Sequence, residues 1–207
     1  MFKNIIFDWS GVIKDALESQ FFAINKIFEK AGIEQITFDE MRNNWEQPYM
    51  RFYNKYAPDW TIEFEQKLYH EVINRKDFPK SKACPGMVDL IKKIKEKGLS
   101  MVVLSSDPVA KISAEVKDYG LENIFDEIFA DVYDKAEKIH ELISKNNFKA
   151  EETVFIGDSN HEIEVGKIAG IKTIAVTWGF STAEKLKSYS PDFLVNNTKE
   201  LEKILLE

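Results

Sequence analysis

The chain has 207 residues, enough for one large domain or for a domain with a smaller inserted unit. Its formal net charge of −7 argues against broad attraction to DNA or RNA, which depends on Lys and Arg neutralising phosphates. The single cysteine, Cys84, excludes an internal disulfide, and no apolar run approaches the roughly 18 residues that would span a bilayer. We therefore expect a cytoplasmic protein that binds neither nucleic acid nor membrane.

The first predicted element is a short apolar run, Ile5-Ile6-Phe7, which carries Asp8 to its end and reaches Gly11 three residues later. This pattern predicts a buried strand followed by a sharp turn. A carboxylate in this place can be a nucleophile, a metal ligand or an ordinary turn-forming residue.

The segment 15–81 contains no convincing buried strand and is predicted to be an all-helical insert, a small cap domain. Apolar residues recur at helical spacing up to Gly32, where the first helix ends. Thr37 and Glu40 have the spacing of a capping box that starts a second helix, and residues 61–73 form another.

From Met87 on, helical and extended stretches alternate. The predicted elements are helices at about 87–97, 109–118, 136–145, 161–169 and 200–206, and strands at 99–105, 128–129, 153–158, 172–176 and 190–195. This alternation predicts an α/β fold, a Rossmann-like parallel sheet with helices on both faces, for a core domain of residues 1–14 and 82–207. In such sheets, ligands bind beyond the carboxyl ends of the strands.

Four short polar stretches fall at or just after these strand ends. They are Asp8, Ser105 with Ser106, Lys135, and Asp158 with Glu162. Taken singly, each has a commoner structural role, as a turn former, a helix cap or a solvent-facing lysine. Together they supply carboxylates, hydroxyl groups beside backbone amides, and an ammonium group, which is a set suited to phosphoryl transfer.

A carboxylate can attack phosphorus only if the repulsion between the two anions is removed. A Mg²⁺ ion held by Asp8 and Asp158 would do this, because Mg²⁺ prefers hard oxygen ligands. Ser105, the neighbouring amides and Lys135 would hold the phosphate oxygens. The two acids would be neighbours only if the first and fourth strands of the sheet are adjacent, which the sequence leaves open.

Over essentially its whole length the chain resembles the haloacid dehalogenase-like hydrolase superfamily, in the branch with a helical cap inserted after the first strand. IIFDWSGVIKD is similar to the first motif and makes Asp8 the nucleophile. VVLSS resembles the second, with the phosphate-binding Ser105, and DKAEKIHEL the third, with Lys135. VFIGDSNHEIEVGKIAGIKTIAVTWG is similar to the fourth, in which Asp158 would bind metal and Glu162 would contribute through water.

One position departs from the motif. Phosphatases of this superfamily carry a second Asp two residues after the nucleophile, which protonates the leaving group and then activates water. Here that residue is Ser10, whose hydroxyl cannot act as a general acid or base near pH 7. Its backbone carbonyl can still bind the metal. We therefore expect the Mg²⁺ and phosphate site to be retained and the release of phosphate to be impaired.

The resemblance leaves three functions open. The main prediction is a Mg²⁺-dependent phosphatase, a monomer or homodimer, that acts on a small phosphorylated metabolite through an aspartyl-phosphate on Asp8. Its acid would be an unusual one, for example from the cap, or one supplied by the substrate. The second is a hydrolase similar to the phosphonoacetaldehyde hydrolases, which use a cap lysine as a Schiff base; Lys26, Lys30 and Lys55 lie in the cap. The third is a catalytically impaired relative that binds a phosphorylated ligand or partner.

Four further expectations concern side chains and hinges. Trp9 is expected to line the entrance near the leaving group, and His161 to face solvent at a helix start. The cap aromatics around Arg51 are expected to pack between helices, the alternative being that Arg51 meets an anionic group of the substrate. The cap is expected to sit over the strand ends on hinges near Lys14–Ala16 and Ser81–Pro85.

Overall fold

The computed structural model describes residues 2–207, and a six-stranded parallel sheet forms its centre. The strands lie in the order β5-β4-β1-β6-β7-β8. Their bounds are Asn4–Phe7 (β1), Ser100–Leu104 (β4), Glu127–Phe129 (β5), Thr153–Gly157 (β6), Lys172–Val176 (β7) and Phe193–Val195 (β8). The predicted α/β fold with a parallel sheet is confirmed, and β1 pairs directly with both β4 and β6.

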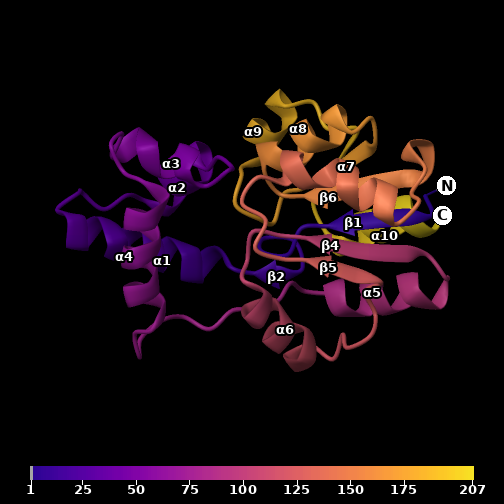
Figure 1. Ribbon diagram of the computed structural model, residues 1–207, viewed down its shortest axis with the longest axis horizontal. Coiled ribbons are helices and arrows are strands. Elements are labelled where there is room, and N and C mark those ends of the chain that lie inside the picture. Colours follow the sequence, from indigo (N-terminus) through magenta and orange to yellow (C-terminus); the bar gives the residue numbers. More distant parts are fainter. Residues whose placement is uncertain (1) are drawn as a thin grey trace.

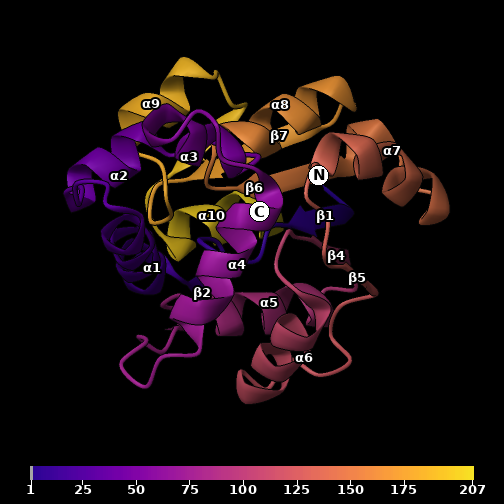
Figure 2. The same cartoon turned by 60° about the vertical axis from the view of Figure 1, so that its left-hand side comes forward.

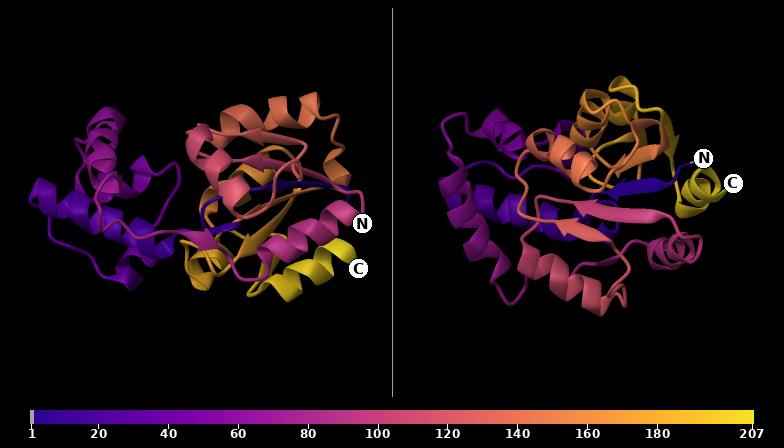
Figure 3. Two further views of the ribbon diagram at one scale, coloured as in Figure 1. Left: turned by 90° about the horizontal axis from the view of Figure 1, so that it is seen from below. Right: turned by 45° about the vertical axis from the view of Figure 1, so that its right-hand side comes forward.

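Helices cover both faces of this sheet (Figures 1 and 3). One layer holds α5 (Met87–Glu96), α6 (Val109–Asp118) and α10 (Thr198–Leu206), and the other holds α7 (Lys135–Lys145), α8 (Asn160–Ile168) and α9 (Ala183–Ser188). Side chains alternate between the layers, because Ile5 and Phe7 pack on the first while Ile6 packs on the second. Burial on both faces explains why these strands read as unbroken apolar runs.

The structure differs from the predicted elements at a few positions. Strand β6 ends at Gly157, so Asp158 lies just beyond the sheet, and the last strand, β8, begins only at Phe193. The helix α9 was not predicted, because its short sequence lacks an extended apolar periodicity. Within the described residues, no helix combines the length and the apolar character needed to cross a membrane.

Four further helices lie beyond the carboxyl ends of the strands, while both termini lie at the opposite end of the molecule (Figure 1). Figure 2 turns these four helices toward the viewer. They are α1 (Leu17–Ala31), α2 (Phe38–Asn44), α3 (Met50–Tyr56) and α4 (Ile62–Ile73), and they share a hydrophobic cluster of their own. Helix α2 begins where the capping pattern predicts, since the Thr37 side chain accepts a hydrogen bond from the Glu40 N–H. The helix α3 was not predicted.

The chain leaves the sheet for these helices and returns from them along two neighbouring segments. The two-residue strands β2 (Lys14–Asp15) and β3 (Lys82–Ala83) pair there in antiparallel fashion. The backbone of Cys84 is also tied to the outgoing segment, because its N–H donates to the Ile13 carbonyl at 2.7 Å.

Candidate active site

The polar residues predicted at the strand ends converge at one edge of the sheet. Because β1 lies between β4 and β6, the residues that follow these three strands are neighbours in space. Carboxylate oxygens of Asp8, Asp158 and Glu162 lie within 4.8 Å of one another. The adjacency of the two aspartates, which the sequence left open, thus follows from the strand order.

Lys135, the first residue of α7, is the cation at the centre of this group. Its side chain is buried, and Nζ lies 2.9 Å from Asp8 Oδ2 and 2.5 Å from Glu162 Oε1. Burial opposes the charged amine, but the two carboxylates outweigh it and raise the pKa of Lys135. The lysine therefore stays charged and bridges the two acids.

The pKa values of the three carboxyl groups are shifted in different directions. Burial raises the pKa of Asp8 to about 7, although Lys135 acts in the opposite direction. Burial, then Asp8 and Glu162, raise the pKa of Asp158 well above its usual value. Burial also disfavours the charge on Glu162, but Lys135, His161 and the Ser159 hydroxyl together lower its pKa to about 2. Burial and mutual repulsion thus oppose ionisation of all three acids, because one lysine balances only part of their charge.

Glycines let the backbone approach these acids closely. Gly11 has φ of 84°, and a Cβ there would lie 2.1 Å from Asp158 Oδ2. A Cβ on Gly157 would lie 2.1 Å from Glu162 Cγ. The sharp turn predicted after Asp8 is therefore required by the second aspartate as well as by the chain path.

The donor set fits a divalent cation such as Mg²⁺. Three buried carboxylates face a single buried lysine, so a second positive charge would offset the remaining repulsion. Asp158 is held by the Phe180 N–H at 2.5 Å and has no ion-pair partner among residues 2–207. Asp8 and Asp158 would hold such an ion by their side chains, with the backbone carbonyl of Ser10 alongside.

The serines after β4 offer hydrogen-bond donors on the other side of Asp8. Ser105 is buried, and its Oγ accepts from the Asp107 N–H at 3.1 Å, which leaves its hydroxyl hydrogen available to another acceptor. The half-buried Ser106 follows, and its backbone N–H meets no acceptor in the part of the chain that the structure describes. Both can donate to an anion beside Asp8.

Two expectations were wrong. His161 does not face solvent: it is buried, burial lowers its pKa, and its Nε2 accepts from the Lys135 N–H at 3.0 Å, which fixes the start of α7. Trp9 does not line an entrance. Its ring is fully buried and stacks on Tyr119 with centroids 6.0 Å apart, while its indole N–H donates to Glu115 at 2.6 Å. A large ring with a single donor is most stable buried beside one acceptor.

The helices α1–α4 contact the strand-end site through its flanking loops. Gln47 N–H donates to Asn160 Oδ1 at 3.1 Å, and Asn160 Nδ2 donates back to the Gln47 carbonyl at 3.2 Å. Trp45 stacks on Phe180, whose backbone holds Asp158, with ring centroids 4.7 Å apart. These contacts link the helical layer directly to the acidic cluster.

The other cationic candidates lie elsewhere. Arg51 is over half exposed and lies 3.7 Å from Glu164. Lys26, Lys30 and Lys55 pair with surface carboxylates of the helical segment, so none is an uncharged amine beside Asp8. The structure thus offers no observation in favour of a Schiff base.

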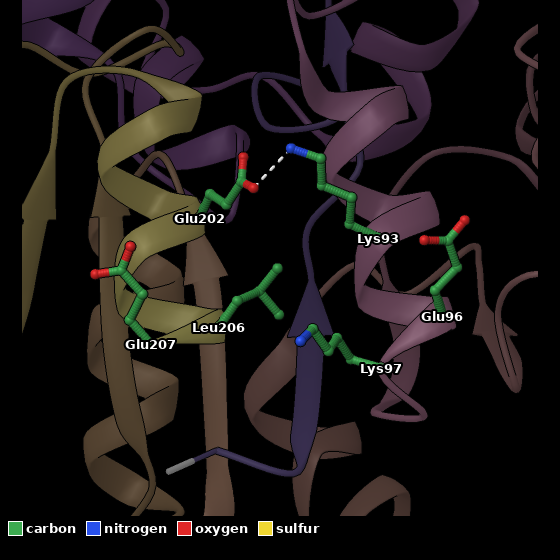
Figure 4. A pocket seen from close by; sticks show the side chains of 6 residues that line it. All are labelled: Lys93, Glu96, Lys97, Glu202, Leu206 and Glu207. Atoms are coloured by element: carbon green, nitrogen blue, oxygen red, sulfur yellow. Dashed lines mark hydrogen bonds and ion pairs between the residues drawn. The ribbon is translucent and has the colours of Figure 1, made fainter.

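A surface pocket of about 470 Å³ lies away from this site, between α5 and α10 (Figure 4). Figure 4 shows Lys93 paired with Glu202 across it, and the two atoms lie 2.6 Å apart. Most of its charged side chains are exposed, and it contains none of the residues described above. We assign the catalytic chemistry to the strand-end cluster, because buried acids with strongly shifted pKa values gather there.

Comparisons with known proteins find phosphatases among the relatives of this chain. A phosphoglycolate phosphatase from Synechococcus elongatus is 23% identical over 202 residues, 95% of this chain and 94% of that one. A pyrophosphatase, PpaX, from Anoxybacillus flavithermus is 30% identical over 122 residues, 56% of this chain and 57% of that one.

Solved structures show the same fold. A haloacid dehalogenase-like family hydrolase from Streptococcus pneumoniae superposes with a TM-score of 0.81 at 19% identity, over 98% of both chains. A hydrolase from Pseudomonas syringae superposes with a TM-score of 0.78 at 14% identity, over 98% of this chain and 97% of that one. The family model described as haloacid dehalogenase-like hydrolase matches residues 5–176. The chain therefore belongs to the haloacid dehalogenase-like hydrolase family.

Proposed function

We propose that this chain is a Mg²⁺-dependent phosphatase that hydrolyses a small phosphorylated metabolite through an aspartyl-phosphate on Asp8. The observation that carries the proposal is the position of Lys135, whose Nζ lies 2.9 Å from Asp8 and 2.5 Å from Glu162 within a cluster of three buried carboxylates. Relatives named phosphoglycolate phosphatase and pyrophosphatase support phosphate as the group transferred.

The residues divide the work as follows. The Asp8 carboxylate attacks phosphorus, the bond from phosphorus to the ester oxygen breaks, and the alcohol leaves with a proton. The Trp9 N–H, 2.7 Å from Asp8 Oδ1, orients the carboxylate. Lys135 and the donors at Ser105 and Ser106 hold the phosphate oxygens as charge develops on them. A bound Mg²⁺ would supply charge neutralisation between the carboxylate and the phosphate. Water then attacks the aspartyl-phosphate and releases inorganic phosphate.

We also propose that residues 15–81 act as a cap domain on a core of residues 1–14 and 82–207. The four helices lie over the strand ends, and the paired segments β2 and β3 are the two crossings that would serve as hinges. Asp8 is only 5% exposed, so a phosphate ester needs an opening motion to reach it.

A substrate screen tests the proposal. Wild type, Asp8→Asn and the exposed control Asp89→Asn are assayed for phosphate release from small phosphate esters, with Mg²⁺ and with a chelator. We expect activity in wild type and the control that requires the metal, and none in Asp8→Asn. Intact mass spectrometry during turnover should show one added phosphoryl group on wild type.

Other outcomes point elsewhere. Cleavage of phosphonoacetaldehyde without hydrolysis of any phosphate ester would support a carbon–phosphorus hydrolase instead. Binding of phosphate esters with no turnover and no phosphoryl adduct would support a ligand-binding relative.

A further inference from the structure

The hydroxyl of Ser10 points to a carboxylate from a distant part of the chain. Ser10 Oγ donates a hydrogen bond to Asp107 Oδ2, across 97 residues of sequence. Asp107 lies in the loop between β4 and α6, two residues after the phosphate-site serine Ser105. A carboxyl group therefore stands one side-chain hydrogen bond away from the position two residues after the nucleophile.

The backbones of both partners are fixed. The N–H groups of Ile13 and Lys14 donate to the Trp9 carbonyl at 2.9 and 3.0 Å, which closes the turn that presents Ser10. Asp107 donates its own N–H to Ser105 Oγ at 3.1 Å. Its carbonyl accepts from the Asp131 N–H at 3.0 Å. The Asp107 backbone is thus fixed beside Ser105, and its carboxyl group is held by the Ser10 hydroxyl.

The Asp107 carboxyl group also has room to act. Both Ser10 and Asp107 are partly exposed, unlike the deeply buried acids of the metal cluster. The Ser10 hydroxyl binds Asp107 Oδ2, and Oδ1 receives no hydrogen bond from residues 2–207. Burial, and then the charge of Asp107, raise the pKa of Tyr69 on α4. Asp107 is therefore close enough to α4 for its charge to act on a residue of the helical layer.

Glu65 is a second candidate for the acid that protonates the leaving group. Glu65 on α4 is buried, and burial raises its pKa to about 7. Its surroundings are the tyrosines of the helical layer, among them Tyr53, whose pKa burial and then Glu65 raise. No hydrogen bond in the described chain joins Glu65 to Ser10 or to the phosphate-site serines. The connected carboxylate is Asp107.

We propose that Asp107 is the acid–base residue of this chain and that Ser10 orients its carboxyl group. The inference rests on the proposed phosphatase function. In the first step Asp8 forms its bond to phosphorus, the bond from phosphorus to the leaving oxygen breaks, and that oxygen takes the proton of Asp107. In the second step water gives a proton to the Asp107 carboxylate and bonds to phosphorus. The bond to Asp8 breaks, its electron pair returns to the carboxylate, and phosphate leaves.

The test measures rates of hydrolysis in the presence of Mg²⁺, both in a single turnover and in steady state. The substrates are one aryl phosphate, p-nitrophenyl phosphate, and one alkyl phosphate. In Asp107→Asn we expect steady-state turnover of both to fall by ~10²–10⁴-fold, the usual contribution of acid–base catalysis. The aryl phosphate should still give a burst of one p-nitrophenol per site, because a good leaving group needs little protonation. Phosphorylated enzyme should accumulate. Asp118→Asn, an exposed change at the far end of α6, should match wild type.

Two more variants separate chemistry from folding. Ser10→Asp added to Asp107→Asn returns a carboxylate to the same space and should restore most of the lost turnover. Ser10→Ala removes only the orienting hydrogen bond and should slow alkyl phosphates more than aryl phosphates, even if Asp107→Asn fails to fold.

Each contrary outcome has one meaning. A wild type inert to every phosphate ester would overturn the phosphatase function, and this proposal with it. An active wild type whose Asp107→Asn variant turns over alkyl phosphate equally fast would overturn the role of Asp107 alone. So would loss of turnover in Glu65→Gln with Asp107→Asn unaffected, or a slow Asp107→Asn variant that neither accumulates phosphoenzyme nor recovers with Ser10→Asp.

Discussion

The strand-end site differs from its boundary with the helical layer in whether buried polar groups have hydrogen-bond or ion-pair partners. At the strand ends, each buried acid is held by specific donors: Asp8 by Lys135, Glu162 by Lys135 and Ser159, and Asp158 by a backbone N–H. At the boundary with the helices, Trp45 Nε1, Gln47 Oε1 and Ser181 Oγ are buried without a partner among the described residues.

The two regions therefore differ in how completely their polar groups are organised before a ligand binds. Fixed charges and dipoles at the strand ends are organised before any ligand arrives, which is what stabilising a phosphoryl transition state requires. Unpartnered groups at the boundary need water or a ligand to complete their hydrogen bonds, because an unsatisfied buried donor or acceptor is costly. The strand ends are therefore paired without a ligand, and the boundary is not.

Removing the cation from the strand-end site should have the largest effect. Lys135→Met leaves the buried Asp8 and Glu162 carboxylates without their shared partner, so the free energy of unfolding should fall by ~3–5 kcal/mol near neutral pH. Turnover should fall by ~10²–10³-fold, because one donor to the developing charge is lost. Urea unfolding and steady-state kinetics measure the two effects. Lys138→Met, on the surface of the same helix, should change neither; equal stability in both variants would contradict the ion-pair network.

The acid buried in the helical layer should give a pH-dependent effect. Burial raises the pKa of Glu65 from 4.5 to about 7. Below pH 4.5 the group is protonated in both folded and unfolded chains. Between these values only the unfolded chain releases the proton, so the free energy of unfolding falls as pH rises, and above pH 7 the loss is complete.

Glu65→Gln should remove this dependence. The measured quantity is the free energy of unfolding of Glu65→Gln minus that of wild type. This difference should be larger above pH 7 than below pH 4.5 by about 3 kcal/mol, at about 1.4 kcal/mol per unit of pKa shift. Urea unfolding at the two pH values measures it. Glu63→Gln changes an exposed acid on the same helix whose pKa is lowered, so it should show no such rise. Parallel profiles for wild type and Glu65→Gln would refute the shift.

A smaller effect is expected at the boundary itself. Arg42 Nη2 donates to the carbonyls of Thr177 and Ser181 at 2.9 and 3.0 Å, from α2 to the loop that carries Phe180. Arg42→Ala should lower the free energy of unfolding by about 2 kcal/mol and speed hydrogen exchange along that loop. Arg75→Ala, which removes an exposed pair with Asp77, is the control. Unchanged exchange in Arg42→Ala would show that this contact does not hold the helices down.

The same contrast explains what the sequence could predict. The buried strands are continuous apolar runs and the strand-end acids follow them directly, so the sheet and the gathering of polar residues at its edge were accessible. The contact of Ser10 with Asp107 joins residues that are 97 positions apart, and no local sequence pattern predicts it. His161 and Trp9 were misjudged for a related reason: each is buried by a partner, Lys135 or Glu115, whose place depends on the tertiary fold.

The smallest effect tests whether the helical layer and the sheet unfold together. Thr37 and Asn197 cap α2 and α10 in the same way, each accepting from the N–H three residues on, at 3.1 and 3.0 Å. Replacing either cap by Ala should cost about 1 kcal/mol. Because the helical layer has its own hydrophobic cluster, extended by Phe180 from the sheet side, we expect one shared transition that both variants lower equally.

Calorimetry of Thr37→Ala and Asn197→Ala, with exchange protection of α1 and α5 as separate probes, measures this. If Thr37→Ala lowers an early transition confined to α1–α4 while Asn197→Ala lowers only a later one, the two regions are independent units. The contacts at Trp45 and Gln47 would then be a docking surface between two separately stable bodies. A single transition means that packing of the helices on the strand-end loops contributes to the stability of the sheet itself, because Trp45 and Phe180 join the two regions in one hydrophobic cluster.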